Sequence, residues 1–218
     1  MSIITQTASS ICGITIPDSH PLKIVAVSGG LNHPSKTTSL LDAILIELGQ
    51  YADFEIHFVK LSDIGSQVGA ALYRQDLPPV VEQHVQQIEQ ADVLLVATPV
   101  YRASFTGLFK HLFDFVDQFA LVDKPVLLAA CGGSDRHALV LEHQLRPLFS
   151  FFQANTLPIG VYATDADFSH YQIQSAALTA RIKLAVQRAL PFLQKAAETV
   201  ADQVQSEVYT LPVIAVAG

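Results

Sequence analysis

A hydroxyl-rich loop near the start of the chain has the residue types of a phosphate-binding site. The stretch 28–39 reads SGGLNHPSKTTS and follows the short β-branched run KIVAV, which is typical of a buried strand. Apolar residues then recur at helical spacing and predict a helix over roughly 37–49 that closes at Gly49. Backbone N–H groups and the positive end of the dipole favour an anion at a helix N-terminus. Uncharged donors are added there by the side chains of Ser35, Thr37 and Thr38.

Two interpretations of this loop remain open from its residues alone. It can be a phosphate cradle, or it can be an ordinary strand-to-helix loop with a Ser/Thr cap. Two nucleotide-binding motifs are absent: no glycine precedes Lys36 as in a Walker motif, and the second and third glycines of G-x-G-x-x-G are missing. If the loop binds phosphate, its hydroxyls suit a single phosphate monoester.

The rest of the chain alternates apolar strands with amphipathic helices. After the first strand, we expect strands near 54–59, 92–98, 125–130 and 157–162. Further helices are expected near 79–90, 107–118, 136–153 and 170–200. The segment 61–79 has turn-prone breaks and is interpreted as a long loop with some helix. We expect residues 1–21 to be an extension, 22–200 the folded domain and 201–218 a tail.

This order of elements predicts an α/β fold with helices on both faces of a doubly wound, five-stranded parallel sheet. In the strand order 2-1-3-4-5, ligands bind at the carboxyl ends of strands beside the switch point. Loops with unusual chemistry follow the first, third and fourth strands, at 28–37, 99–104 and 131–134. All three therefore meet at one edge of the sheet and are expected to build one site.

Composition excludes several classes of protein. The net charge of −7 argues against a nucleic-acid-binding surface, and no apolar run is long enough to cross a membrane. Residues 1–21 lack the basic start and apolar core of a signal peptide, so we expect a cytoplasmic protein. Apolar residues make up 50% of the chain and charged residues 15%, which favours a homodimer or homotetramer that buries extra apolar surface.

Metal and acid–base chemistry have little support in the sequence. Cys12 and Cys131 form neither a CxxC nor a zinc pattern, and the eight histidines show no HExxH spacing. There is no G-x-S-x-G elbow, and Ser28 has no base partner visible in the sequence. We therefore predict no metal site and no catalytic triad.

Two longer motifs resemble a known family. The segments TPVYRASFTGLFKHLFD (98–114) and GGSDRHALVLEHQLRP (132–147), together with the first loop, resemble the NAD(P)H-dependent FMN reductases of flavodoxin-like fold. The nearest subgroup supplies reduced flavin to alkanesulfonate and methanesulfonate monooxygenases. The resemblance implies FMN and NADH or NADPH as cofactors, and a flavin-dependent monooxygenase as acceptor of FMNH2. Hydride transfer between these cofactors needs no protein base, which agrees with the absence of a triad.

The resemblance also implies roles for single residues. The family's first loop holds the FMN phosphate with Ser, Arg and Ser, but here Gly30 and Asn32 replace the first two, whereas Ser35 and Thr37 match. Losing a guanidinium removes a bidentate contact, so we expect weak phosphate binding, partly compensated by Lys36. The cofactor-binding residues that we predict in this loop are Ser28, Asn32, Ser35, Lys36 and Thr37. Those in the other two loops are Pro99, Val100, Tyr101, Arg102, Ala103 and Ser104, and Gly132, Gly133 and Ser134.

The last two loops have alternatives. Tyr101 can pack against the flavin, or it can be a rim aromatic that packs on a helix. Gly132 and Gly133 can let the backbone approach the flavin ring, or they can form a simple turn. The sequence shows no recognisable site for the 2′-phosphate of NADPH and therefore does not distinguish NADH from NADPH. Arg74 and Arg136 are candidates for such a site.

Pro147 interrupts an apolar-periodic segment that otherwise predicts one continuous helix. Its ring collides with the carbonyl four residues back, that of His143. We therefore predict a kink or a wide, π-type turn between about 140 and 147. In the resembling subgroup the matching position lies at a π-helical insertion in an oligomer interface, linked to flavin transfer. His143 is thus a candidate for flavin exchange, with a simple proline kink as the alternative.

The leading hypothesis is an NAD(P)H:FMN oxidoreductase that treats FMN as a substrate and supplies FMNH2 to a sulfonate-type monooxygenase. One alternative is a flavodoxin-like electron carrier that holds FMN permanently. Another is a quinone or azo reductase of the same fold.

Overall fold

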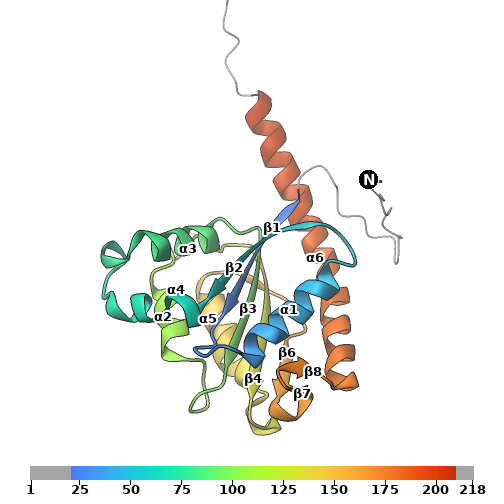
Figure 1. Cartoon of the computed structure of the whole chain (residues 1–218). Helices are drawn as coiled ribbons and strands as arrows, with labels where there is room; N and C mark the ends of the chain where they lie inside the picture. Colours follow the sequence, from blue (N-terminus) through green and yellow to red (C-terminus); the bar gives the residue numbers. More distant parts are fainter. Residues whose placement is uncertain (1–20, 210–218) are drawn as a thin grey trace, which may run out of the picture.

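A parallel β-sheet forms the centre of the molecule (Figure 1). The structure, a computed structural model, describes the backbone of residues 21–209 and the side chains of residues 21–203. The strands are paired in the order β2-β1-β3-β4-β5, and β6 also pairs with β4. Their bounds are β1 Leu22–Ser28, β2 Phe54–Lys60, β3 Val93–Pro99, β4 Pro125–Gly132, β5 Asn155–Thr156 and β6 Val161–Thr164. The predicted fold class and order are confirmed, with the expected fifth strand divided in two.

Helices cover both faces of the sheet (Figure 1). On one face, α1 and α6 pack on the alternate strand residues Ile24, Leu95 and Leu127. On the other face, α2, α3, α4 and α5 pack on their neighbours Val25, Val96 and Leu128. These helices are α1 Lys36–Leu48, α2 Leu61–Ala70, α3 Pro79–Glu89, α4 Gly107–Asp114, α5 Arg146–Phe151 and α6 Ala176–Tyr209. Because both faces are buried, the central strands are apolar throughout, as the sequence indicated.

Three expected elements differ in the structure. The segment from residue 61, expected to be a long loop with some helix, begins with the regular helix α2, whose Leu61, Ile64 and Val68 are buried. Their helical spacing outweighs the break signalled by Gly65, which lies inside the helix. The helix α4 ends at Asp114, four residues before the expected end.

The final helix also begins and ends later than expected. A short antiparallel hairpin, β7 (Phe168–Ser169) and β8 (Gln172–Ile173), occupies the start of the predicted segment. Its turn holds His170 and Tyr171 at positive φ angles of 46° and 66°. Because α6 continues to Tyr209, part of the expected tail is helical. The expected N-terminal extension lies outside the described residues, apart from residue 21, as do residues 210–218.

The segment around Pro147 confirms the predicted wide turn. Instead of one helix over 136–153, a single 3₁₀ turn, a π-helix over Leu141–Leu145 and α5 follow one another. The N–H of Arg146 donates to the carbonyl of Leu141, five residues back. This π spacing precedes Pro147, which has no N–H to continue the α-helical pattern. His143 lies within the π-helix and is exposed.

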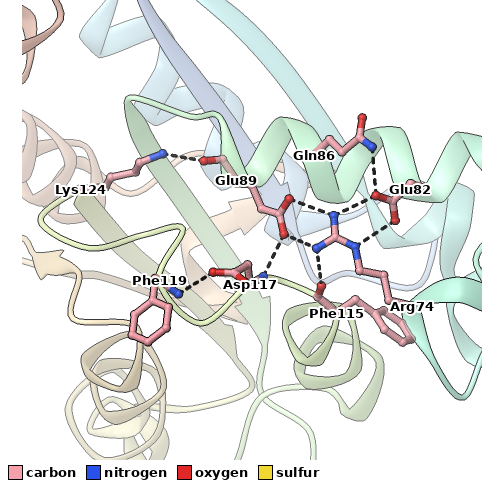
Figure 2. Close-up of polar contacts among 8 residues, drawn as sticks. All are labelled: Arg74, Glu82, Gln86, Glu89, Phe115, Asp117, Phe119 and Lys124. Carbon is pink, nitrogen blue, oxygen red and sulfur yellow. Dashed lines mark hydrogen bonds and ion pairs between the residues drawn. The ribbon is translucent and has the colours of Figure 1, made fainter. Parts of the chain in front are cut away.

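Arg74 forms hydrogen bonds both to α3 and to the residue that follows α4 (Figure 2). Its Nη2 donates to Glu82 Oε1 at 2.8 Å and to Glu89 Oε2 at 2.9 Å, both on α3. Its Nη1 also donates to the carbonyl of Phe115, directly after α4, at 3.2 Å. The hydrogen bonds to Glu89 and Glu82 raise the pKa of Arg74 above its ordinary value. Arg74 therefore has a structural role in joining α3 to the end of α4.

The aromatic core beneath α5 yields a stability prediction. The Phe149 side chain is fully buried, and its ring meets Phe113 edge-on at 5.0 Å between centroids. Phe149→Ala should lower the free energy of unfolding by about 3–5 kcal/mol because it removes a buried ring and leaves a cavity. The control Phe119→Ala, at a side chain that is 62% exposed, should change it by less than about 0.5 kcal/mol. Denaturant unfolding measures both, and equal losses would contradict this account of the core.

Candidate functional site

The carboxyl edge of the sheet is held together at Gly29. Its N–H donates to the carbonyl of Ala97 at the end of β3, at 2.7 Å, and the hydroxyl of Thr106 donates to its carbonyl at 3.2 Å. A Cβ at this position would lie 2.9 Å from the Phe109 ring and 3.1 Å from the Thr98 hydroxyl, so a side chain has no room. The loops after β1 and β3 are therefore locked side by side.

A cavity of about 370 Å³ opens at this edge. The three loops singled out in the sequence all contribute to its walls. From the first loop, the lining residues are Gly30, Leu31, Asn32, Pro34, Ser35, Lys36 and Thr37. The others are Pro99, Val100 and Tyr101, then Cys131, Gly132 and Gly133, and finally Asp165 and Tyr171. The convergence predicted from the strand order is thus present in the structure.

The first loop leads into the N-terminus of α1 at one end of the cavity. The Ser35 hydroxyl caps this helix by accepting the N–H of Thr38 at 3.4 Å, and Thr37 is buried beside it. A Cβ on Gly30 would lie 2.4 Å from the Ser35 hydroxyl oxygen, so a side chain at position 30 would have to displace that hydroxyl. Backbone donors and hydroxyls at a helix N-terminus fit a phosphate group.

Two charged side chains lie on the rim beside this helix start. Lys36 Nζ is 2.7 Å from Asp165 Oδ1 and 5.9 Å from the centroid of the Phe168 ring. Lys36 is the one cationic side chain among the residues that line the cavity. By contrast, Ser28 lies behind the cavity, where its buried hydroxyl is 2.9 Å from that of Thr38. Ser28 therefore supports the helix start from below.

The second loop makes a tight turn whose first residues face the cavity. Tyr101 and Ser104 pair through backbone hydrogen bonds of 2.9 and 3.2 Å. Between them, Arg102 and Ala103 have φ angles of 51° and 69°, a strained conformation for residues with a Cβ. Arg102, Ala103 and Ser104 do not line the cavity, unlike Tyr101, which is 46% exposed. Ser104 instead donates to Gln144 of the π-helix at 3.1 Å, joining this loop to that helix.

In the third loop, Tyr162 from β6 fills the space above Gly132. A Cβ on Gly132 would lie 2.0 Å from the Tyr162 hydroxyl oxygen. That hydroxyl donates to the carbonyl of Ser134 at 2.7 Å, so Tyr162 fixes the loop. The side chain of Ser134 does not line the cavity, whereas Gly132 and Gly133 do. The glycines present bare backbone, which a flat ligand can approach closely.

Cys131 forms part of the cavity floor. The pKa of its thiol is raised to about 12, and burial is the largest cause of this rise. The thiol is therefore protonated at neutral pH and is a poor nucleophile. Among the described residues, no group of three or more His, Cys, Asp or Glu side chains could hold a metal ion. The cavity thus offers binding groups rather than a reactive side chain.

Six of the lining residues were not among those predicted to bind the cofactor: Gly30, Leu31, Pro34, Cys131, Asp165 and Tyr171. Leu31 and Pro34 lie within the predicted first loop, where their side chains carry no polar group to signal a role. Asp165 and Tyr171 follow β6, at the same carboxyl edge as the other loops. The rule that ligands bind at this edge, applied to the last strand as well, points to Asp165, whereas Tyr171 lies in a hairpin turn where a helix was expected.

The two arginines considered for a 2′-phosphate site lie in different surroundings. Arg74 does not line the cavity and is held by two carboxylates, as Figure 2 shows, which makes it a poor candidate. Arg136 is exposed in the turn that follows the third loop. Arg136 does not line the cavity either, but it follows a loop that does.

The sheet order and the site define a flavodoxin-like α/β protein with its ligand cavity beside the β1/β3 switch point. Solved structures agree. An oxidoreductase from Corynebacterium diphtheriae matches with a TM-score of 0.71 and 32% identity, over 81% of this chain and 99% of that chain. The apo form of the NADH:FMN oxidoreductase EmoB gives 0.68 and 27%, over 80% and 89%. A flavodoxin-like WrbA-like protein from Agrobacterium tumefaciens, 15% identical with a TM-score of 0.51, shares the fold.

The chain belongs to the NADPH-dependent FMN reductase family, whose model matches residues 22–169. The NADH-dependent FMN reductase SfnF of Pseudomonas fluorescens is 62% identical over 79% of this chain and 92% of that protein. An NADPH-type FMN reductase of Pseudomonas aeruginosa is 57% identical over 78% and 92%. The predicted family and enzyme class, with FMN and NAD(P)H as cofactors, are thereby confirmed. No helix in the described part of the chain is long and apolar enough to span a membrane.

The contact between Gly132 and Tyr162 yields a prediction for the flavin-free protein. Gly132→Ala should lower the free energy of unfolding by about 1–3 kcal/mol, because the added methyl displaces Tyr162 from its hydrogen bond to Ser134. At the matched control Gly133→Ala, the nearest atom is Asp165 Oδ2 at 3.9 Å, so we expect a change within about 0.5 kcal/mol. Denaturant unfolding compares the two, and indistinguishable variants would disprove the tight contact.

Proposed function

We propose that this FMN reductase binds FMN as an exchangeable substrate in the cavity at the carboxyl edge of the sheet. The observation that carries the proposal is that the cavity has only weak anion-binding groups at the end where the phosphate would bind. It offers hydroxyls, backbone N–H groups and one lysine, and that lysine is already paired with Asp165. Charge-assisted bidentate contacts from arginine are stronger than these. A site built in this way favours reversible binding and release.

In this proposal the FMN phosphate lies over the N-terminus of α1, near Ser35 and Thr37. The isoalloxazine ring then extends past Tyr101 toward Gly132 and Gly133, where bare backbone permits close contact. The bound flavin supplies the hydride chemistry. The chain's own residues orient the ring, exclude water from one face and hold the phosphate. The fully protonated Cys131 thiol beneath the ring supplies bulk without charge.

We further propose that the reduced flavin passes to a flavin-dependent monooxygenase of the sulfonate type in the cytoplasm. The similarity to SfnF, an NADH-dependent FMN reductase, supports the step of this proposal that forms the reduced flavin. We also propose a homodimer or homotetramer. Its support is an apolar cavity of about 550 Å³ between α4 and α5, beside Phe151, whose side chain is 65% exposed. Light scattering at micromolar concentration tests this assembly, and a monomeric mass would refute it.

One assay separates this function from its alternatives. NAD(P)H oxidation that depends on added FMN, by protein that is purified free of flavin, supports a reductase with exchangeable FMN. An electron carrier would retain FMN and oxidise no nicotinamide. A quinone or azo reductase would retain its flavin and turn over a quinone by ping-pong kinetics.

The hydroxyls at the start of α1 can be tested by substitution. Replacing Ser35 and Thr37 together by Ala should weaken FMN binding by about 1–3 kcal/mol, if both hydroxyls bond the phosphate. Calorimetric titration with FMN measures the loss. Riboflavin, which lacks the phosphate, serves as the control ligand and should bind both proteins equally. Equal weakening for FMN and riboflavin would place the phosphate elsewhere.

The π-helix can be tested by shortening it. Deleting His143 removes one residue from the π-helix and should restore regular α-helical bonding. If this wide turn assists flavin exchange through the Ser104–Gln144 contact, the variant should release FMN more slowly and show less FMN-dependent turnover. The control His143→Ala keeps the chain length and should retain exchange. Unchanged release and turnover in the deletion variant would exclude a role in exchange.

A further inference from the structure

A carboxylate faces the proposed phosphate position. Asp165 begins the short turn after β6 and lines the cavity together with Lys36. Its Oδ1 atom is 2.7 Å from Lys36 Nζ, and its Oδ2 atom lies 3.9 Å from where a Cβ on Gly133 would be. Asp165 therefore spans the gap between the start of α1 and the glycine loop.

The surroundings of Lys36 give it two possible anionic partners. Lys36 is the first residue of α1, where backbone donors and the Ser35 cap favour a phosphate. A phosphate monoester carries about −1.5 to −2 charges at pH 7, so it attracts the Lys36 ammonium more strongly than one carboxylate does. The side chains of Lys36 and Asp165 are 33% and 65% exposed. Ion pairs this exposed are weak, and a bound phosphate can displace them.

The neighbouring carboxylate of Asp167 does not share this position. Asp167, two residues on, accepts the N–H of Thr164 at 2.7 Å and its hydroxyl at 2.9 Å. It is therefore committed to the turn itself and does not line the cavity. Asp165 forms its ion pair across the cavity rim, with a residue 129 positions away in the chain. The turn held by Asp167 thus presents Asp165 to Lys36.

We propose that Asp165 limits the affinity of the site for FMN by competing with the phosphate for Lys36 and by repelling that phosphate. This inference rests on the proposed binding of FMN with its phosphate over α1. Without the carboxylate, Lys36 would be free to bind the phosphate and retain the flavin. With it, release of FMN is assisted because the ion pair with Asp165 forms again as the phosphate leaves. Asp165 is thus a determinant of flavin exchange, not a catalytic residue.

Substitution of Asp165 by its uncharged amide tests the proposal. Asp165→Asn should bind FMN about two- to fivefold more tightly, the range expected when an exposed ion pair no longer competes. Its affinity for FMN should also fall more steeply with salt, because Lys36 then acts on the phosphate alone. Riboflavin affinity should stay unchanged. Calorimetric titration and stopped-flow release of FMN measure these effects on the full chain.

Two controls separate competition from a general charge effect. Asp53→Asn removes the same charge at an exposed position before β2, at the opposite edge of the sheet, and should leave FMN affinity unchanged. In a Lys36→Gln background, the gain from Asp165→Asn should fall by at least half. An unchanged FMN affinity in Asp165→Asn, an equal gain for riboflavin, or the same gain without Lys36 would overturn the proposal. If the unmodified protein itself binds no FMN, the proposed function fails instead.

Discussion

The structure depends most on the close contact at Gly29, where the end of β1 meets the end of β3. This residue bonds Ala97 through its N–H and Thr106 through its carbonyl, and neighbouring atoms leave no room for a side chain. The contact sets how α1 leaves the sheet and therefore where its N-terminus points. It also fixes the loop after β3 beside that N-terminus. A shift here would move two of the three walls of the cavity.

The fold and the general location of the site were predictable because their signals are local. Apolar runs such as 92–98 indicate buried parallel strands, and the alternation with helices leaves few topologies. The position of the three loops at one edge then follows from the strand order. Pro147 is a local signal too, since a residue without an N–H must disturb a helix, and the π-helix before it agrees.

The remaining features arise from contacts between distant parts of the chain. Tyr162 explains the need for glycine at 132, but the two residues meet only when β6 pairs with β4. Asp165 likewise reaches Lys36 across the folded sheet. The segment with α2 was predicted as a long loop with some helix, because Asp63 and Gly65 are turn-prone and the apolar face of α2 is buried only in the folded protein. The predicted ligands Arg102 and Ala103 belong to the loop but lie in its turn, away from the cavity wall.

The site combines groups that attract an anion with one carboxylate that repels it. The helix N-terminus, the hydroxyls and Lys36 attract phosphate, whereas Asp165 opposes it at the same rim. The most direct test of this account is a crystal structure of the protein soaked with FMN. The account predicts phosphate oxygens within hydrogen-bonding distance of Ser35 and Thr37, with the flavin ring along Gly132 and Gly133. A phosphate bound away from the α1 N-terminus, or a ring outside the cavity, would contradict it.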